Sequence, residues 1–228
     1  MINKEINFFL EGVYLFLENA SSQKILNEKL VKQGWYPNNI TLRHKKLVHE
    51  SIDDFMIRCL TGDYYEDIKT EYFYNSYPHR REIYQEAFTL YEETRYLASI
   101  PLFLSQIDGI ISEYGLSGMF LGDNKLNNSS KPEKLKFFEY LNFHIHSYSG
   151  NSLIKYHENI IELRSDLSIS KGTSKISNSN VIGQLNRHGI LHGNRNFLDY
   201  GTQLNTLKII SLTLFIMNTI EKLKLENT

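Results

Sequence analysis

The sequence predicts an all-α protein built as a helical bundle. Proline occupies only four positions, and apolar residues mostly recur at spacings of three and four instead of alternating. This is the period of helices with one buried face, whereas half-buried strands alternate with a period of two. A chain of 228 residues is long enough for one well-buried core. We expect residues 1–75 to form an N-terminal helical extension and residues 76–228 to form the main helical domain.

Segments of helical period follow one another along the chain. We expect helices over residues 2–18, 21–33, 80–97, 133–148 and 151–166. Within residues 41–61 we expect an amphipathic stretch that follows the basic run RHKK and ends at Gly62. A more apolar helix is expected to begin near Pro101, because proline suits a first helical turn. Thr202 is expected to cap the last helix, QLNTLKIISLTLFIMNTIEKLKL. That helix is apolar almost all round, so it should lie at the centre of the bundle.

Breaks between these segments are rich in polar or turn-forming residues. The run GWYPNN interrupts the chain, and its Trp35 and Tyr36 are expected to be packed turn aromatics. Residues 63–78 are rich in tyrosine, and their periodicity does not decide between an irregular connection and a short helix. Residues 122–132 and 168–180 are expected to be loops because they are too polar to bury much surface.

Composition and charge exclude several classes of protein. A formal charge of −1 argues against a large, uniformly basic nucleic-acid-binding surface. Cys59 is the only cysteine, so an intrachain disulfide and a multi-cysteine metal site are both excluded; it is expected to be a small buried residue. The N-terminus does not resemble a signal peptide, and the run IISLTLFIM is far shorter than the roughly 20 residues that span a bilayer. We therefore expect a cytoplasmic protein with no membrane partner.

The run NRHGILHGN carries the most informative motif. In it Arg187 precedes His192 by five positions, with the polar residue His188 directly after the arginine. This Arg-x4-His spacing resembles the Arg-x(4–6)-His signature of HEPN domains, which are all-helical modules of many prokaryotic toxins and antiviral ribonucleases. The wider run LNRHGILHG…DYGTQLN is also similar to uncharacterised bacterial proteins that combine it with a helix like SIPLFLSQIDGI. This broader resemblance covers roughly residues 95–222.

The resemblance implies a HEPN-like C-terminal core and a metal-independent endoribonuclease without a cofactor. It further implies a homodimer with a composite cleft, 2′,3′-cyclic phosphate and 5′-hydroxyl products, and a role as a toxin or in antiphage defence. RNA and an antitoxin or companion defence protein are the expected partners. Some HEPN domains are modified on a tyrosine two residues after the motif histidine; Asn194 stands there in this chain, which does not support that mode.

The residue types fit this chemistry. Cleavage of RNA without a metal needs a group that titrates near neutral pH to take a proton from the ribose 2′-hydroxyl, and His192 is the expected general base. Arg187 is expected to stabilise the extra negative charge on the phosphate, which a planar guanidinium does better than a lysine. On an ideal helix the two positions are about 140° apart, so a long side chain or a second subunit must close the gap.

Several neighbouring residues are expected to support the site. His188 shares a helical face with His192 and is a candidate phosphate ligand, and Asn186 and Tyr200 are further candidates for supporting or substrate-binding roles. Asp108 lies on a very apolar helix and should therefore have a partner. It is expected either to orient a histidine or hold Arg187, or else to brace a neighbouring helix.

Other interpretations remain open from the sequence. Arg187 and His192 can be ordinary polar contacts near a turn, or belong to a silent domain that binds RNA, a nucleotide or a protein; a purely structural dimerisation protein is a third possibility. Metal binding by the two histidines of HGILH, or by His144 and His146, is disfavoured because the zincin glutamate is missing. The basic runs at 43–46 and 79–81 are either RNA contacts or solvated helix surfaces.

Overall fold

The computed structural model describes residues 25–116, Ile169 and residues 185–226, and every regular element in these ranges is helical. The all-α prediction is therefore confirmed. A helical stretch covers residues 25–32, as expected for the 21–33 segment. The helices expected over residues 2–18, 133–148 and 151–166, and the loop over 122–132, lie outside the described residues, as does all of 168–180 except Ile169.

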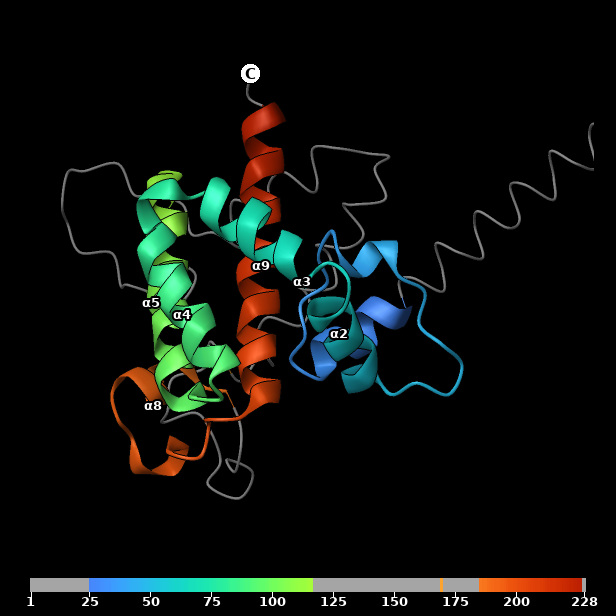
Figure 1. Ribbon diagram of the computed structural model, residues 1–228, viewed down its shortest axis with the longest axis horizontal. Helices are drawn as coiled ribbons and strands as arrows, with labels where there is room; N and C mark the ends of the chain where they lie inside the picture. The colour runs from blue at the N-terminus through green and yellow to red at the C-terminus, as the bar shows by residue number, and fades with distance from the viewer. Residues whose placement is uncertain (1–24, 117–168, 170–184, 227–228) are drawn as a thin grey trace, which may run out of the picture.

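Three helices form the centre of the molecule (Figure 1). They are α4 (Arg81–Glu92), α5 (Tyr96–Glu113) and α9 (Gln203–Glu226), and α5 packs against both of the others. α9 begins as expected, because the Thr202 hydroxyl accepts a hydrogen bond from the Asn205 amide at 3.1 Å. From Asn205 to Ile220 every α9 residue except Lys208 is buried, which confirms its central position.

Lys208 is the one partly exposed position in this stretch of α9, and it faces the GWYP turn. Its ammonium nitrogen lies 5.5 Å from the centroid of the Trp35 ring, and burial lowers the pKa of Lys208. The Trp35 indole donates a hydrogen bond of 2.7 Å to Asp53. Trp35 and Tyr36 are 0% and 2% exposed, so their prediction as packed aromatics is confirmed.

The 41–61 segment is helical in only two parts. A short 3-10 turn, η1 (Thr41–Arg43), is followed by residues without helical structure, and α2 (Ile52–Thr61) begins after Ser51. The amphipathic stretch expected after the basic run, ending at Gly62, is therefore confirmed as α2. Ser51 sets the true start, because its hydroxyl accepts a hydrogen bond from the Asp54 amide at 3.0 Å. Cys59, in α2, is fully buried as expected.

Residues 63–78 are mostly helical, which settles a question that periodicity left open. The elements are α3 (Tyr65–Asp67), a π-helical segment η2 (Ile68–Asn75) and the start of η3 (Pro78–Arg80). Phe73 of η2 meets the rings of Tyr84, Phe88 and Phe103 edge-on at centroid distances of 4.9, 5.0 and 5.8 Å. These aromatic contacts connect η2 to α4 and α5.

α5 begins at Tyr96, so the prediction that this helix starts near Pro101 is wrong. Pro101 lies inside the helix, beyond its first turn. A proline inside a helix has no amide hydrogen to give to the carbonyl four residues earlier, which here is that of Leu97. That carbonyl receives its hydrogen bond from another part of the chain, as the candidate site shows.

One continuous cluster of buried apolar residues joins the described segments. It includes Trp35, Phe55 and Phe73 together with Phe103 and Phe215. Residues on both sides of the domain boundary expected near residue 75 thus belong to one core. The division into two domains stays a prediction. Among the described residues no helix is both long and apolar enough to cross a bilayer.

Candidate functional site

The Arg-x4-His motif forms one short helix with a defined start and end. α8 (Arg187–Leu191) begins after Asn186, whose side-chain oxygen accepts a hydrogen bond from the Gly189 amide at 2.7 Å. Gly193 has a φ of +61° and ends the helix: its amide bonds to the Ile190 carbonyl, and the Asn194 amide bonds to the Gly189 carbonyl. This is the Schellman arrangement, so Gly193 is the glycine that caps the C-terminal end of α8.

The α8 turn packs against the ring of a buried phenylalanine. A β-carbon placed on Gly189 would lie 2.3 Å from the ring of Phe197, which belongs to η7 (Arg195–Phe197) and is 2% exposed. Glycine is therefore needed here for close approach of the Phe197 ring. The space beside Gly189 is therefore filled by this ring.

Arg187 is held by an acidic residue from the centre of the bundle. Its Nη2 atom lies 2.9 Å from Oδ2 of Asp108 on α5, and the two residues are 79 positions apart in the sequence. Their side chains are 26% and 25% exposed, so this ion pair is open to solvent only in part. Holding Arg187 is thus observed for Asp108, and because the same contact joins α8 to α5, Asp108 also braces a neighbouring helix.

His188 and His192 form the exposed part of the motif. Their rings lie 4.3 Å apart between centroids, at an interplanar angle of 53°, and both residues are exposed. The shared face expected from their spacing is therefore observed. Arg195 begins η7 three positions after His192 and is also exposed. This turn thus presents two imidazole groups and one guanidinium group to solvent.

The other two expected site residues have structural contacts. Asn186 is fully buried, where it caps α8. The Tyr200 hydroxyl donates a hydrogen bond of 2.9 Å to the Leu97 carbonyl, the group that Pro101 leaves without a helical donor. Burial raises the pKa of Tyr200, so the phenol stays protonated and remains a donor. Tyr200 thereby fastens the chain between α8 and α9 to the first turn of α5.

Replacing Tyr200 with phenylalanine is expected to lower the free energy of unfolding by about 0.5–1.5 kcal/mol, because the Leu97 carbonyl loses its donor. The loss should shrink in a Pro101→Ala background, where the alanine amide supplies the helical hydrogen bond. Urea unfolding of the four proteins in this double-mutant cycle measures the coupling. Equal losses in both backgrounds would show that Tyr200 does not compensate for Pro101.

The basic run at 79–81 is engaged within the fold. The Arg80 guanidinium bonds to Gln106 and Glu113 of α5, and His79 lies 3.1 Å from Glu113. Gly109 makes room for this guanidinium, since a β-carbon there would lie 2.6 Å from it. This run was one of the candidate RNA contacts, and in the structure its residues His79 and Arg80 connect η3 to α5.

Sequence reasoning missed Phe197 and Pro101 as residues that shape the site. No local pattern signals that Gly189 faces an aromatic ring. A signal did exist for Pro101, because apolar periodicity continues upstream of it to Tyr96. A proline inside a helix leaves the carbonyl four residues earlier, here that of Leu97, without its helical hydrogen bond.

No group of three or more potential metal ligands occurs within residues 25–116 and 185–226. His144 and His146 lie outside the described residues. No family model, no curated protein and no solved structure matches the chain.

Proposed function

We propose that this protein is a metal-independent endoribonuclease of the HEPN type, with Arg187 and His192 as its catalytic residues. The observation that carries the proposal is the fixed α8 turn, in which Arg187 is tied to Asp108 while His192 is exposed at the helix end. The proposal also draws on the resemblance of the Arg-x4-His motif to HEPN ribonucleases.

The chemistry follows from the two side chains. His192 takes the proton of a ribose 2′-hydroxyl, and the oxygen then attacks the adjacent phosphorus. Arg187 compensates the negative charge that grows on the non-bridging oxygens of the phosphate. The bond to the 5′-oxygen breaks, and that oxygen takes up a proton. The products are a 2′,3′-cyclic phosphate and a 5′-hydroxyl end, and no metal ion is required.

Asp108 acts as a positioning residue in this scheme. The bond to Asp108 orients the plane of the Arg187 guanidinium, a group whose geometry matches that of a phosphate. His188 and Arg195 are exposed near His192 in the sequence and are proposed to bind neighbouring phosphates. A homodimer is proposed to complete the cleft, as in HEPN ribonucleases, within a cytoplasmic toxin or antiphage system that includes an antitoxin or companion protein.

Replacing Asp108 with alanine is expected to lower the RNA cleavage rate by about 10- to 100-fold, because Arg187 loses the contact that orients it. Asp108→Glu should restore much of the rate, since it keeps the carboxylate. Glu113→Ala is the matched control: it removes an acidic residue of the same helix that pairs with Arg80 instead. Cleavage rates under single-turnover conditions measure the three effects. A control as slow as Asp108→Ala would indicate general damage to α5.

A second candidate function is a silent module that binds RNA, a nucleotide or a protein without cleaving. The observation in its favour is that Arg187 is already bound by Asp108. Such a module needs the exposed histidines as ligands but needs no base.

The two functions are separated by incubating the purified protein with total tRNA and a structured RNA in excess EDTA. Wild type is expected to cleave, and Arg187→Ala and His192→Ala, with folding checked by circular dichroism, are expected to have lost cleavage. RNA binding without cleavage by wild type would favour the silent module. Neither binding nor cleavage would favour a structural role.

A further inference from the structure

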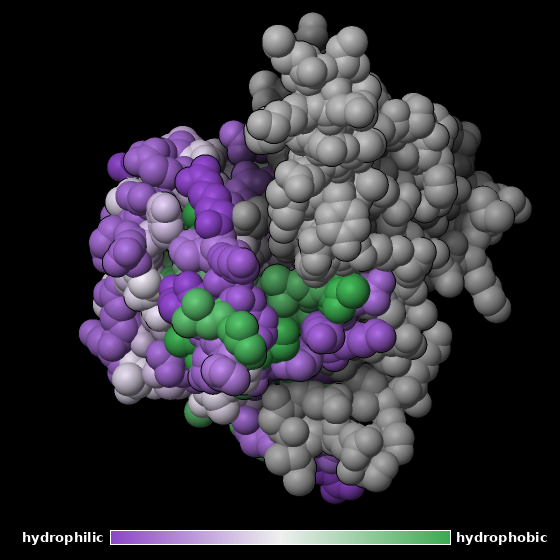
Figure 2. Space-filling model, turned by 90° about the vertical axis from the view of Figure 1, so that its right-hand side faces the viewer, coloured by the Kyte–Doolittle hydropathy of each residue, from purple (hydrophilic) through white to green (hydrophobic). Residues whose placement is uncertain are grey.

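The loop of residues 45–50 carries two adjacent apolar side chains at its tip, and both protrude into solvent. Leu47 is 61% exposed and Val48 is 90% exposed, the highest value among the large apolar side chains of the described residues. Figure 2 shows apolar surface gathered on the side of the molecule to which this part of the chain extends. Single exposed apolar residues are common, whereas adjoining ones that form a continuous exposed patch are a candidate contact surface.

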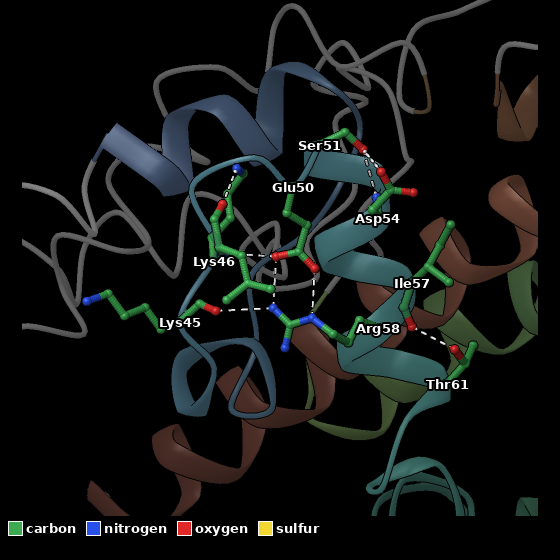
Figure 3. Close-up of polar contacts among 9 residues, drawn as sticks. Lys45, Lys46, Glu50, Ser51, Asp54, Ile57, Arg58 and Thr61 are labelled. Atoms are coloured by element: carbon green, nitrogen blue, oxygen red, sulfur yellow. Dashed lines mark hydrogen bonds and ion pairs between the residues drawn. The ribbon is translucent and has the colours of Figure 1, made fainter.

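The loop has a fixed shape. Glu50 binds Arg58 of α2 through both carboxylate oxygens, at 2.7 Å to Nε and 2.9 Å to Nη2 (Figure 3). The same carboxylate accepts a hydrogen bond from the Leu47 amide at 3.0 Å, and Arg58 donates to the Lys45 carbonyl at 3.1 Å. The Arg58 hydrogen bond is the main cause of the lowered pKa of Glu50. This ion pair therefore holds the apolar tip in place on α2.

The charge around the tip is positive. Arg43 and Lys45 are exposed and Lys46 is partly exposed, whereas the one acidic residue of the loop, Glu50, is paired with Arg58. A second copy of this loop would bring like charges together, so self-association through the tip is disfavoured. A convex apolar tip with a basic border instead complements a surface that is negatively charged outside and apolar beneath.

We propose that the 45–50 loop docks the protein on an anionic phospholipid surface, with Leu47 and Val48 entering the interface and the basic residues contacting lipid phosphates. The loop lies on the opposite side of the molecule from α8 (Figure 1), so docking leaves the candidate catalytic turn exposed. The expectation of no membrane partner rested on the lack of a spanning helix and a signal peptide. Docking of a loop tip needs neither.

Sedimentation with vesicles tests the proposal on the full chain. Wild type should bind vesicles of phosphatidylcholine mixed with phosphatidylglycerol, bind phosphatidylcholine alone weakly, and lose binding as salt is raised. Val48→Asp and Leu47→Asp should each weaken binding by about tenfold or more, and each of Lys45→Gln and Lys46→Gln by about fivefold. Leu198→Asp is the matched control, because Leu198 is 60% exposed and lies outside the loop.

Val48→Asp keeps the test decisive even if another variant unfolds, because a side chain that is 90% exposed contributes little to the core. The proposal is overturned if wild type does not bind the mixed vesicles. It is also overturned if the loop variants bind these vesicles as well as wild type does. The same holds if the Leu198→Asp control loses as much binding as the loop variants. Loss of RNA binding in the loop variants, with vesicle binding intact, would assign the loop to RNA instead.

Discussion

Replacing His192 with alanine is expected to lower the rate of RNA cleavage by about 10²–10⁴-fold, the range that a general base typically contributes. His192 is exposed at the C-terminal end of α8. The free energy of unfolding should therefore stay within about 0.5 kcal/mol of wild type, as for most surface substitutions. Single-turnover cleavage and urea unfolding measure the two effects separately.

His188→Ala and His49→Ala are the comparison variants for this prediction. His188 lies against His192 and should cause a smaller loss, whereas His49 is an exposed histidine of a different segment and should cause none. A His192→Ala protein that cleaves at the wild-type rate would remove His192 from the mechanism. Equal losses in all three variants would point to general damage to the fold.

Replacing Phe103 with alanine is expected to lower the free energy of unfolding by about 3–5 kcal/mol. Phe103 is fully buried on α5, and its ring lies 5.0 Å from that of Phe88 and 5.8 Å from that of Phe73 between centroids. The substitution removes contacts to α4 and η2 together and leaves a cavity between them. Urea unfolding followed by circular dichroism measures the change.

Leu198→Ala is the control for Phe103→Ala, because it truncates an apolar side chain that is 60% exposed. It should change the free energy of unfolding by less than about 0.5 kcal/mol. A loss below about 1 kcal/mol for Phe103→Ala would contradict the central place of this ring in the core.

The helical class and the central helix were predictable because they depend on long patterns. The apolar surface of α9 continues almost all round for many residues, and Thr202 marks its start with a cap. A pattern that extends over this many residues predicts a helix even where one position departs from it. The start of α5 was predicted too late because proline favours the first turn of a helix. In the structure Pro101 lies inside the helix, and the Tyr200 hydroxyl donates to the Leu97 carbonyl that the proline leaves without a helical donor.

The candidate site was predictable only in part, for a physical reason. Residue spacing placed His188 and His192 on one face, because this follows from local helix geometry. The contact between Arg187 and Asp108 joins positions 79 residues apart. The sequence required only that Asp108 have some partner, and the choice among candidates depended on how α8 packs on α5.

The ends of the RNA products test the central claim most directly. Wild type should cleave RNA in excess EDTA, and mass spectrometry of the fragments should find 2′,3′-cyclic phosphate and 5′-hydroxyl ends, because the 2′-hydroxyl is the nucleophile. An RNA with a 2′-deoxy nucleotide before the cleaved bond should resist cleavage there. Fragments with 3′-hydroxyl and 5′-phosphate ends, cleavage that stops in EDTA, or cleavage of the deoxy-substituted bond would contradict the assignment of Arg187 and His192 as a metal-independent catalytic pair.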